Sequence, residues 1–89
     1  MARHKHPKVI VKKLGKERAW GQYHESDNII EFDSRLGGKK KLDVYIHERT
    51  HAHFKQMSED DVTKFASVMA DFLWKHHVRF VDNSKHKED

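Results

Sequence analysis

The chain has 89 residues, a net charge of +4, nine histidines and no cysteine. The absence of cysteine excludes disulfides, thiolate metal sites and cysteine nucleophiles, and leaves histidine and carboxylate side chains as zinc ligands. This length is enough for one domain with a small core. No apolar run approaches the roughly 20 residues that span a bilayer, and the N-terminus lacks the apolar stretch of a signal peptide. We therefore expect a soluble cytoplasmic protein with no membrane partner.

The basic residues are clustered along the chain. The clusters lie in residues 1–8, at Lys12, Lys13 and Lys16, and in residues 39–41. Residues 1–8 contain almost nothing apolar, which predicts a flexible basic arm in front of the domain. Such clusters can bind nucleic-acid phosphates or an acidic protein. Because charge runs at chain ends and loop tips are more often simply solvated, nucleic-acid binding is not the favoured function.

Three short apolar segments predict β-strands. Residues 9–14 begin with β-branched side chains and end before a glycine, residues 19–24 contain Trp20, and residues 29–33 follow a compact polar turn. We expect Trp20 to be buried, because a small domain needs large apolar side chains in its core. The connections are short, which favours antiparallel neighbours. The segments therefore predict a three-stranded antiparallel meander.

Residues 40–56 predict a helix whose middle carries the sequence His-Glu-Arg-Thr-His at positions 47–51. Helical residues four apart lie within about 40° of each other, so the rings of His47 and His51 project from one face and can share a cation. Glu48 lies beside them and can accept a proton from a metal-bound water, whose pKa zinc lowers to about 7. The spacing therefore predicts Zn²⁺ bound by His47 and His51, with Glu48 as the general base.

A catalytic zinc needs three protein ligands, so the rest of the chain must supply one more. Ser58 predicts the N-cap of a second helix that opens with the acidic residues 59–61. Glu59 lies three residues before Val62 and so faces the first helix, and a tight turn would bring it close to His51. We predict Glu59 as the third ligand. The alternatives are Asp61 and the more distant histidines His24 and His76.

The remainder of the second helix has an apolar stripe that should be buried. Its members are Val62, Phe65, Ala66, Met69, Phe72 and Leu73. The helix is expected to end near His76 and His77, since partly cationic side chains suit a helix C-terminus. Residues 82–89 predict a disordered charged tail. A single domain should therefore cover residues 9–81.

Four other residues are candidates for supporting roles at such a site. Asp43 lies one turn before His47 and could accept its other ring N–H, which would fix the tautomer. A further group could stabilise the oxyanion of a tetrahedral intermediate. Its members are Tyr23, Tyr45 and Arg49.

The stretch at residues 42–52, with the two histidines and a threonine before the second, resembles the active-site helix of the HExxH metallopeptidases, the zincins. The order of three strands, this helix and an acidic-capped second helix ending in Leu73-Trp74-Lys75 is similar to a small zincin-like family of phages and bacteria. The resemblance covers residues 9–81. It implies a minimal α+β zincin, in which the sheet is followed by two packed helices. It also implies peptide or protein substrates, and location in the cytoplasm of a bacterium or a phage-infected host cell.

Two other functions are compatible with this sequence. A zinc site without catalysis could stabilise a domain that is too small to be secure alone. The chain could instead be a basic module that binds nucleic acid or protein. So short a domain also has little material for a deep specificity pocket, so a partner protein that completes the site is a further expectation.

Overall fold

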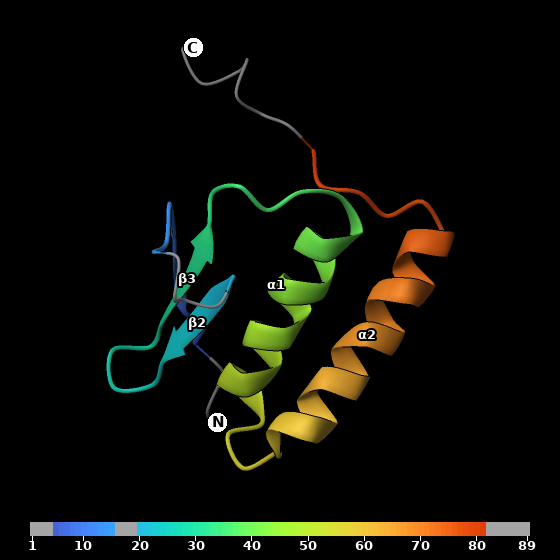
Figure 1. The fold of residues 1–89 in the computed structure, drawn as a ribbon. Helices are drawn as coiled ribbons and strands as arrows, with labels where there is room; N and C mark the ends of the chain where they lie inside the picture. Colours follow the sequence, from blue (N-terminus) through green and yellow to red (C-terminus); the bar gives the residue numbers. More distant parts are fainter. Residues whose placement is uncertain (1–4, 16–19, 82–89) are drawn as a thin grey trace.

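A computed structural model describes residues 5–15 and 20–81, in which three strands are followed by two helices (Figure 1). The elements are β1 (Lys8–Lys12), β2 (Gly21–His24), β3 (Ile29–Asp33), α1 (Gly38–His53) and α2 (Glu59–Lys75). α1 packs against β2 and β3, and α2 packs against α1 (Figure 1). The predicted α+β class, a small sheet followed by two packed helices, is therefore confirmed. The predicted tail and the first half of the predicted arm lie outside the described residues.

The sheet is mixed, so the prediction of an antiparallel meander is wrong. The strand order is β1-β3-β2, with β1 parallel to β3 and β2 antiparallel to it. β3 carries Ile30 and Phe32, which are only 1% and 2% exposed, whereas Val9 and Val11 of β1 are more than half exposed. The strand with the most deeply buried side chains therefore takes the central position.

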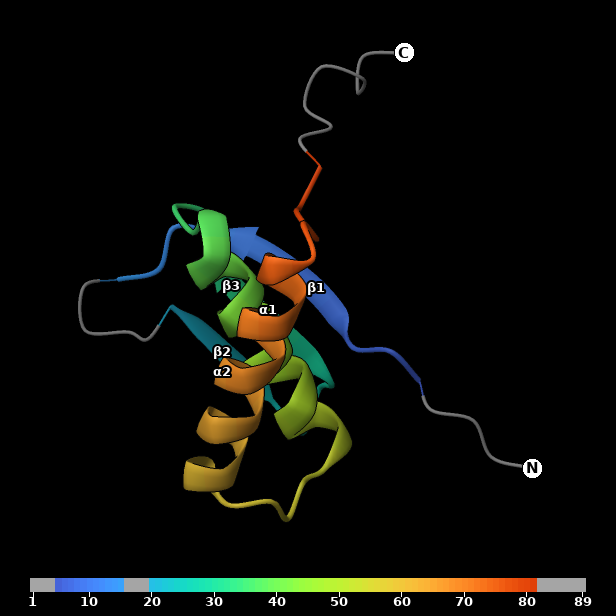
Figure 2. The same ribbon diagram turned by 90° about the vertical axis from the view of Figure 1, so that its right-hand side faces the viewer.

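The two helices lie close to the predicted ranges. α1 begins at Gly38 rather than position 40, and ends at His53 rather than position 56. Ser58 caps α2 as predicted, because its Oγ accepts a hydrogen bond from the backbone N–H of Asp61 at 3.1 Å. Residues 54–58 reverse the chain, so α2 runs back along α1 (Figure 1, Figure 2). This reversal brings the first turn of α2 beside the last turns of α1.

Trp20 is not part of the core, contrary to the prediction. Its side chain is 41% exposed. The guanidinium carbon of Arg35 lies 5.6 Å from the ring centre, and Nζ of Lys40 lies 4.8 Å from it. These cation–π contacts stabilise the ring at the surface. The core is formed instead by a cluster that includes Ile30 and Phe32, with the ring of Tyr45 stacked on Phe32 at 3.6 Å.

The predicted buried stripe of α2 is correct for Val62 and Ala66 and wrong for two phenylalanines. Val62 and Ala66 are fully buried, whereas Phe65 and Phe72 are 42% and 57% exposed. Ala70 is also fully buried. Small alanines on the inner side let α2 approach α1 closely, and this rotation of the helix turns the two rings outward.

Asp33 is a buried carboxylate that joins the end of β3 to the segment after β1. It is 3% exposed and accepts hydrogen bonds from Nε and Nη2 of Arg35 at 2.8 and 2.6 Å. It also accepts bonds from the backbone N–H groups of Leu14 and Arg35 at 3.2 and 2.8 Å. The guanidinium of Arg35 is the main reason why the pKa of Asp33 lies well below its ordinary value of 3.8.

We expect Asp33→Asn to lower the midpoint of thermal unfolding by several degrees at neutral pH, because the amide cannot accept all four of these bonds. A folded-state pKa below the unfolded value means that the stabilisation is complete above about pH 4 and is lost as the pH falls further. The difference between variant and wild type should therefore shrink at about pH 2–3. Circular dichroism melts measure both effects, with Asp27→Asn in the exposed turn as control. Equal changes for the two variants would contradict this assignment.

Candidate metal centre

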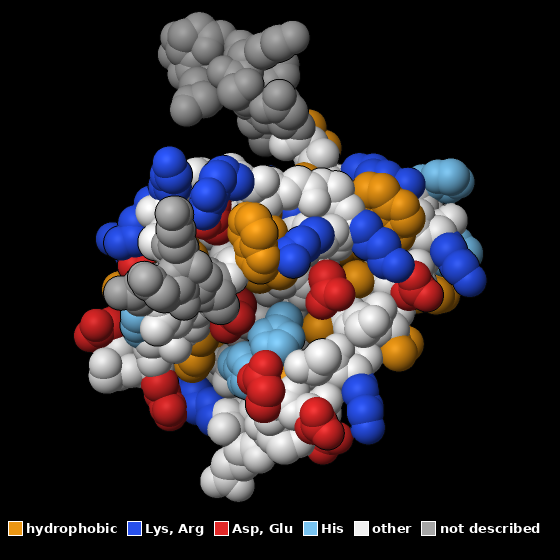
Figure 3. All heavy atoms as spheres, viewed as in Figure 1, with side chains coloured by type: hydrophobic (Ala, Val, Ile, Leu, Met, Phe, Trp, Pro, Cys, Tyr) orange, Lys and Arg blue, Asp and Glu red, His pale blue; other side chains and the backbone are white. Residues whose placement is uncertain are grey.

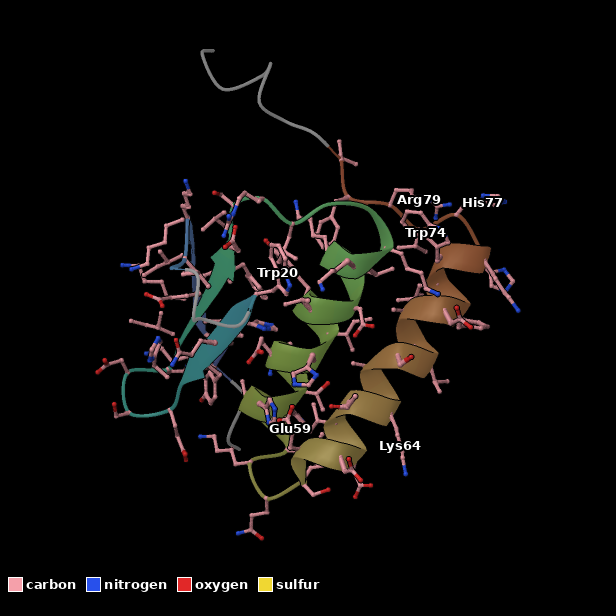
Figure 4. All side chains as sticks on the ribbon, in the orientation of Figure 1. Trp20, Glu59, Lys64, Trp74, His77 and Arg79 are labelled. Atoms are coloured by element: carbon pink, nitrogen blue, oxygen red, sulfur yellow. The ribbon has the colours of Figure 1, made fainter. Side chains whose placement is uncertain are left out.

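His47, His51 and Glu59 come together where α1 faces the first turn of α2. Nε2 of His51 lies 3.2 Å from Nε2 of His47 and 2.8 Å from Oε1 of Glu59. Nε2 of His47 lies 3.2 Å from Oε2 of Glu59. Figure 4 shows Glu59 pointing from α2 towards α1. These three side chains form a group that could hold a metal ion.

Local structure explains why these three side chains converge. The two histidines are one helical turn apart on α1, so their rings share a face, as the spacing predicts. Ser58 at the N-cap makes Glu59 the first residue of α2, and the phase of the helix turns it towards α1. His47 and His51 have side chains that are 18% and 26% exposed, and Glu59 is 71% exposed. The rings therefore form the inner part of the group, and the carboxylate forms its outer rim.

The alternative third ligands lie elsewhere. Asp61 contributes its backbone N–H to the cap of α2 and is not part of the group. Nε2 of His24 lies 3.2 Å from Oε1 of Glu31 in the sheet. His76 contacts the ring of Phe72 at the far end of α2.

The residues present fit a zinc ion. Two imidazoles and one carboxylate match the ligands of catalytic zinc, whereas calcium and magnesium prefer oxygen ligands alone. Ligand atoms about 2.0–2.1 Å from a tetrahedral zinc lie about 3.3 Å from one another. The two imidazole nitrogens lie 3.2 Å apart, Nε2 of His47 lies 3.2 Å from Oε2 of Glu59, and Nε2 of His51 lies 2.8 Å from Oε1. One ligand atom from each residue thus lies within 4.8 Å of the other two, so small side-chain shifts would give the spacing that the ion requires.

Protons alone cannot satisfy all three contacts of this group. A carboxylate oxygen only accepts hydrogen bonds, and a neutral imidazole has one N–H and one lone pair. If both Nε2 atoms donate to the two oxygens of Glu59, no hydrogen lies between the two nitrogens, which are 3.2 Å apart. If His51 donates to His47 instead, the lone pair of His47 faces Glu59. A shared cation would give both nitrogens and the carboxylate a favourable partner.

Glu48 lies next to this group but is not a member of it. It is 9% exposed, and burial raises the pKa of its carboxyl, although the charges of His47 and His51 act in the opposite direction. A cleft of about 510 Å³ is lined by Glu48, His47 and Glu59, and also by Trp20 at its rim. Figure 3 shows the histidines in a hollow in the middle of this face, with acidic side chains around it. The carboxylate of Glu48 is thus placed beside the group and within reach of a molecule in the cleft.

Gly21 at the start of β2 is a positioning residue that was missed in the sequence. A Cβ atom there would lie 2.9 Å from Cγ1 of Val44, 3.0 Å from Cγ of Glu48 and 3.3 Å from Cδ1 of Phe32. Side chains essentially never approach so closely. The absence of a side chain therefore lets α1 pack on β2 with Glu48 between them. The signal available in the sequence was a glycine at the start of an otherwise ordinary strand segment.

We expect Gly21→Ala to destabilise the fold by about 1–3 kcal/mol, because Val44 and Glu48 must move to admit the methyl group. Zinc affinity should stay within a few-fold of wild type, since none of the three group members contacts the new atom. Urea unfolding and zinc titration measure the two quantities. Gly37→Ala is the matched control, because a Cβ there meets nothing within 4 Å. Equal stability of the two variants would refute this account of Gly21.

The predicted supporting residues are divided between two sides of α1. Asp43 lines the same cleft as the group. The hydroxyl of Tyr23 donates to Oδ1 of Asn28 at 3.1 Å. Tyr45 and Arg49 line a separate hollow on the other side of α1. The structure therefore brings only Asp43 of these residues to the cleft.

No family model, no curated protein and no solved structure matches this chain. The resemblance to the HExxH metallopeptidases therefore rests on the motif and on the geometry of the group around it. Neither α1 nor α2 is long and apolar enough to cross a membrane, and the described residues contain no other helix.

Proposed function

We propose that this protein is a zinc-dependent peptidase in which His47, His51 and Glu59 hold the metal and Glu48 is the general base. The observation that carries the proposal is a buried carboxylate next to a convergent His-His-Glu group in an open cleft. A purely structural metal site needs no buried carboxylate beside its ligands, and it usually has four protein ligands with no open coordination position. Here the described residues supply three ligands, which leaves room for water and substrate.

The protein's own residues have distinct parts in this proposal. Bound zinc would supply a Lewis acid that lowers the pKa of a coordinated water to about 7. Glu48 would accept the proton of the attacking water on a carboxylate oxygen and then deliver it to the nitrogen of the leaving amine. The backbone of Gly21 lies beside the Glu48 side chain, since a Cβ atom added there would come 3.0 Å from Cγ of Glu48, and so limits the movement of that side chain. Its burial keeps bulk water away from the transferred proton.

An extended peptide is the substrate that the neighbouring strand suits. β2 is an edge of the described sheet. The backbone N–H of Asp33 donates to the carbonyl of Trp20 at 2.8 Å, so the antiparallel alternation turns the backbone polar groups of Gly21 and Tyr23 away from β3. These groups can pair with a peptide strand, as in β-strand addition. Because Gly21 also lines the cleft, such a peptide would pass beside Glu48.

The test is hydrolysis of an unstructured protein such as casein by the zinc-loaded chain. We expect fragments in the mass spectrum that disappear when zinc is removed by a chelator and return when zinc is restored. A partner protein that completes the shallow cleft belongs to the same proposal, and co-purification from the native host would identify it. One zinc per chain with no cleavage of casein or of a random peptide mixture, either by the chain alone or together with the co-purified partner, would refute the peptidase.

A metal site without catalysis is the second candidate. It is favoured by the position of the group between α1 and α2, since α1 is the only described element against which α2 packs. A metal there would join the two helices and add stability to a small domain.

Nucleic-acid binding has less support, because two lysines of the basic clusters are engaged within the chain. Lys39 pairs with Asp71, and Lys40 lies over the ring of Trp20.

A further inference from the structure

Three large apolar side chains form a stripe on the outer side of α2. Phe65, Val68 and Phe72 are 42%, 67% and 57% exposed, and their spacing of three and four residues places them on one face of the helix. The side that packs on α1 is formed by smaller residues such as Ala66 and Ala70. Both ribbon views show the outer side of α2 uncovered by any other described element (Figure 1, Figure 2). A helix that exposes two phenylalanines and a valine along one side has a second face to bury.

Opposite charges lie at the two ends of this stripe. Asp61 lies four residues before Phe65, and Lys75 lies three residues after Phe72, so both are in line with the apolar side chains. Both charged residues are exposed. Two parallel copies of α2 would bring like charges together. Two antiparallel copies centred on Val68 bring Asp61 of each copy opposite Lys75 of the other.

The apolar residues are self-complementary in the same arrangement. Antiparallel pairing about Val68 places Val68 beside its own copy in the centre. It also brings Phe65 of one copy next to Phe72 of the other, on both sides of the centre. Aromatic side chains in contact across an interface are typical of its stable central part. The stripe therefore combines an apolar centre with two oppositely charged ends, and each end is complementary to the other end of a second, antiparallel copy.

We propose that α2 mediates a symmetric dimer in which the stripe of Phe65, Val68 and Phe72 packs antiparallel against the same stripe of a second copy. A two-fold axis makes such a contact closed, because each surface is used once. One helix pair buries less than a standard interface, so the dimer is expected to be weak and dependent on concentration.

The metal centre stays accessible in this dimer. Figure 4 shows Glu59 pointing towards α1, whereas Lys64 of the same helix points away from it. The ligands and the cleft therefore lie on a different side of α2 from the stripe. The dimer does not depend on the proposed peptidase activity, and its test needs neither zinc nor substrate.

Analytical ultracentrifugation of the full chain between about 10 and 500 µM tests the proposal. We expect the mass of the wild type to rise from monomer to dimer over this range. Val68→Glu should weaken dimerisation about tenfold or more, because it places two carboxylates in the apolar centre. Ser67→Glu is the matched control, since it adds the same charge at an exposed position about 100° round the helix. Circular dichroism checks that both variants keep their helices.

Charge reversal tests the antiparallel direction. Asp61→Lys and Lys75→Asp should each weaken the dimer, and the double variant should restore it, because only antiparallel pairing exchanges the two charges. A wild type that remains monomeric up to the highest concentration would overturn the proposal and leave the stripe to a different partner protein. A dimer that Val68→Glu does not weaken, or that the double variant does not restore, would equally overturn it.

Discussion

Glu48→Gln should abolish peptide cleavage and leave one zinc bound per chain. The substitution keeps the shape of the side chain but removes its capacity to accept a proton. A general base contributes about 10²–10⁴ in rate, so kcat should fall by at least that factor. Metal binding should persist, because Glu48 is not a member of the His47, His51 and Glu59 group. Initial rates on a quenched fluorescent peptide and metal analysis of the same samples measure the two properties.

The stability of Glu48→Gln should equal or exceed that of the wild type. Burial raises the pKa of the Glu48 carboxyl, which means that the fold disfavours its charged form. A neutral amide removes that cost. Glu25→Gln in the exposed turn is the control for an acid-to-amide change and should leave both rate and stability unaltered. Undiminished turnover by Glu48→Gln would mean that another group is the base.

The convergence of His47, His51 and Glu59 was predictable from the sequence because it depends on local periodicity. The helical repeat alone places His47 and His51 on one face, and the N-cap at Ser58 fixes the phase of α2 and thus the direction of Glu59. The only tertiary information required was a short reversal between the two helices, which the spacing of 54–58 supplies. Asp61 and the distant histidines were real alternatives for the third ligand, because the sequence does not fix the angle at which α2 packs against α1.

The sheet and the outer surface were less predictable because they depend on competition between segments. The central position went to β3, the strand with the most deeply buried side chains, and chain order carries no direct information about this choice. Gly21, rather than Trp20, is the residue of this segment that packs against α1. The ring of Trp20 instead contacts the cationic side chains of Arg35 and Lys40 at the surface. On α2 the alanines lie on the side that faces α1. A hydrophobicity pattern does not predict this, because it does not distinguish alanines from the larger apolar residues nearby.

Zinc should raise the thermal stability of the wild type strongly, and His51→Ala should lose nearly all of this effect. A ligand at about 1,000 times its Kd stabilises the fold by about 4 kcal/mol. For a domain of this size, each kcal/mol shifts Tm by about 4–8 °C, so a rise of about 15 °C or more is expected. Nε2 of His51 has the shortest contact of the group, 2.8 Å to Glu59, and its loss leaves two ligands on different helices. Differential scanning calorimetry with and without zinc measures the shift.

Matched variants distinguish the proposed ligand set from its alternatives. His53→Ala removes an imidazole from the same helix but from outside the group, so it should keep the zinc-dependent shift. Glu59→Gln should lose most of the shift because an amide is a poor zinc ligand. Asp61→Asn should keep it, since Asp61 contributes only its backbone to the helix cap. If Asp61→Asn lost the zinc-dependent shift and Glu59→Gln kept it, Asp61 would be the third ligand. An unchanged shift in His51→Ala would refute the metal centre itself.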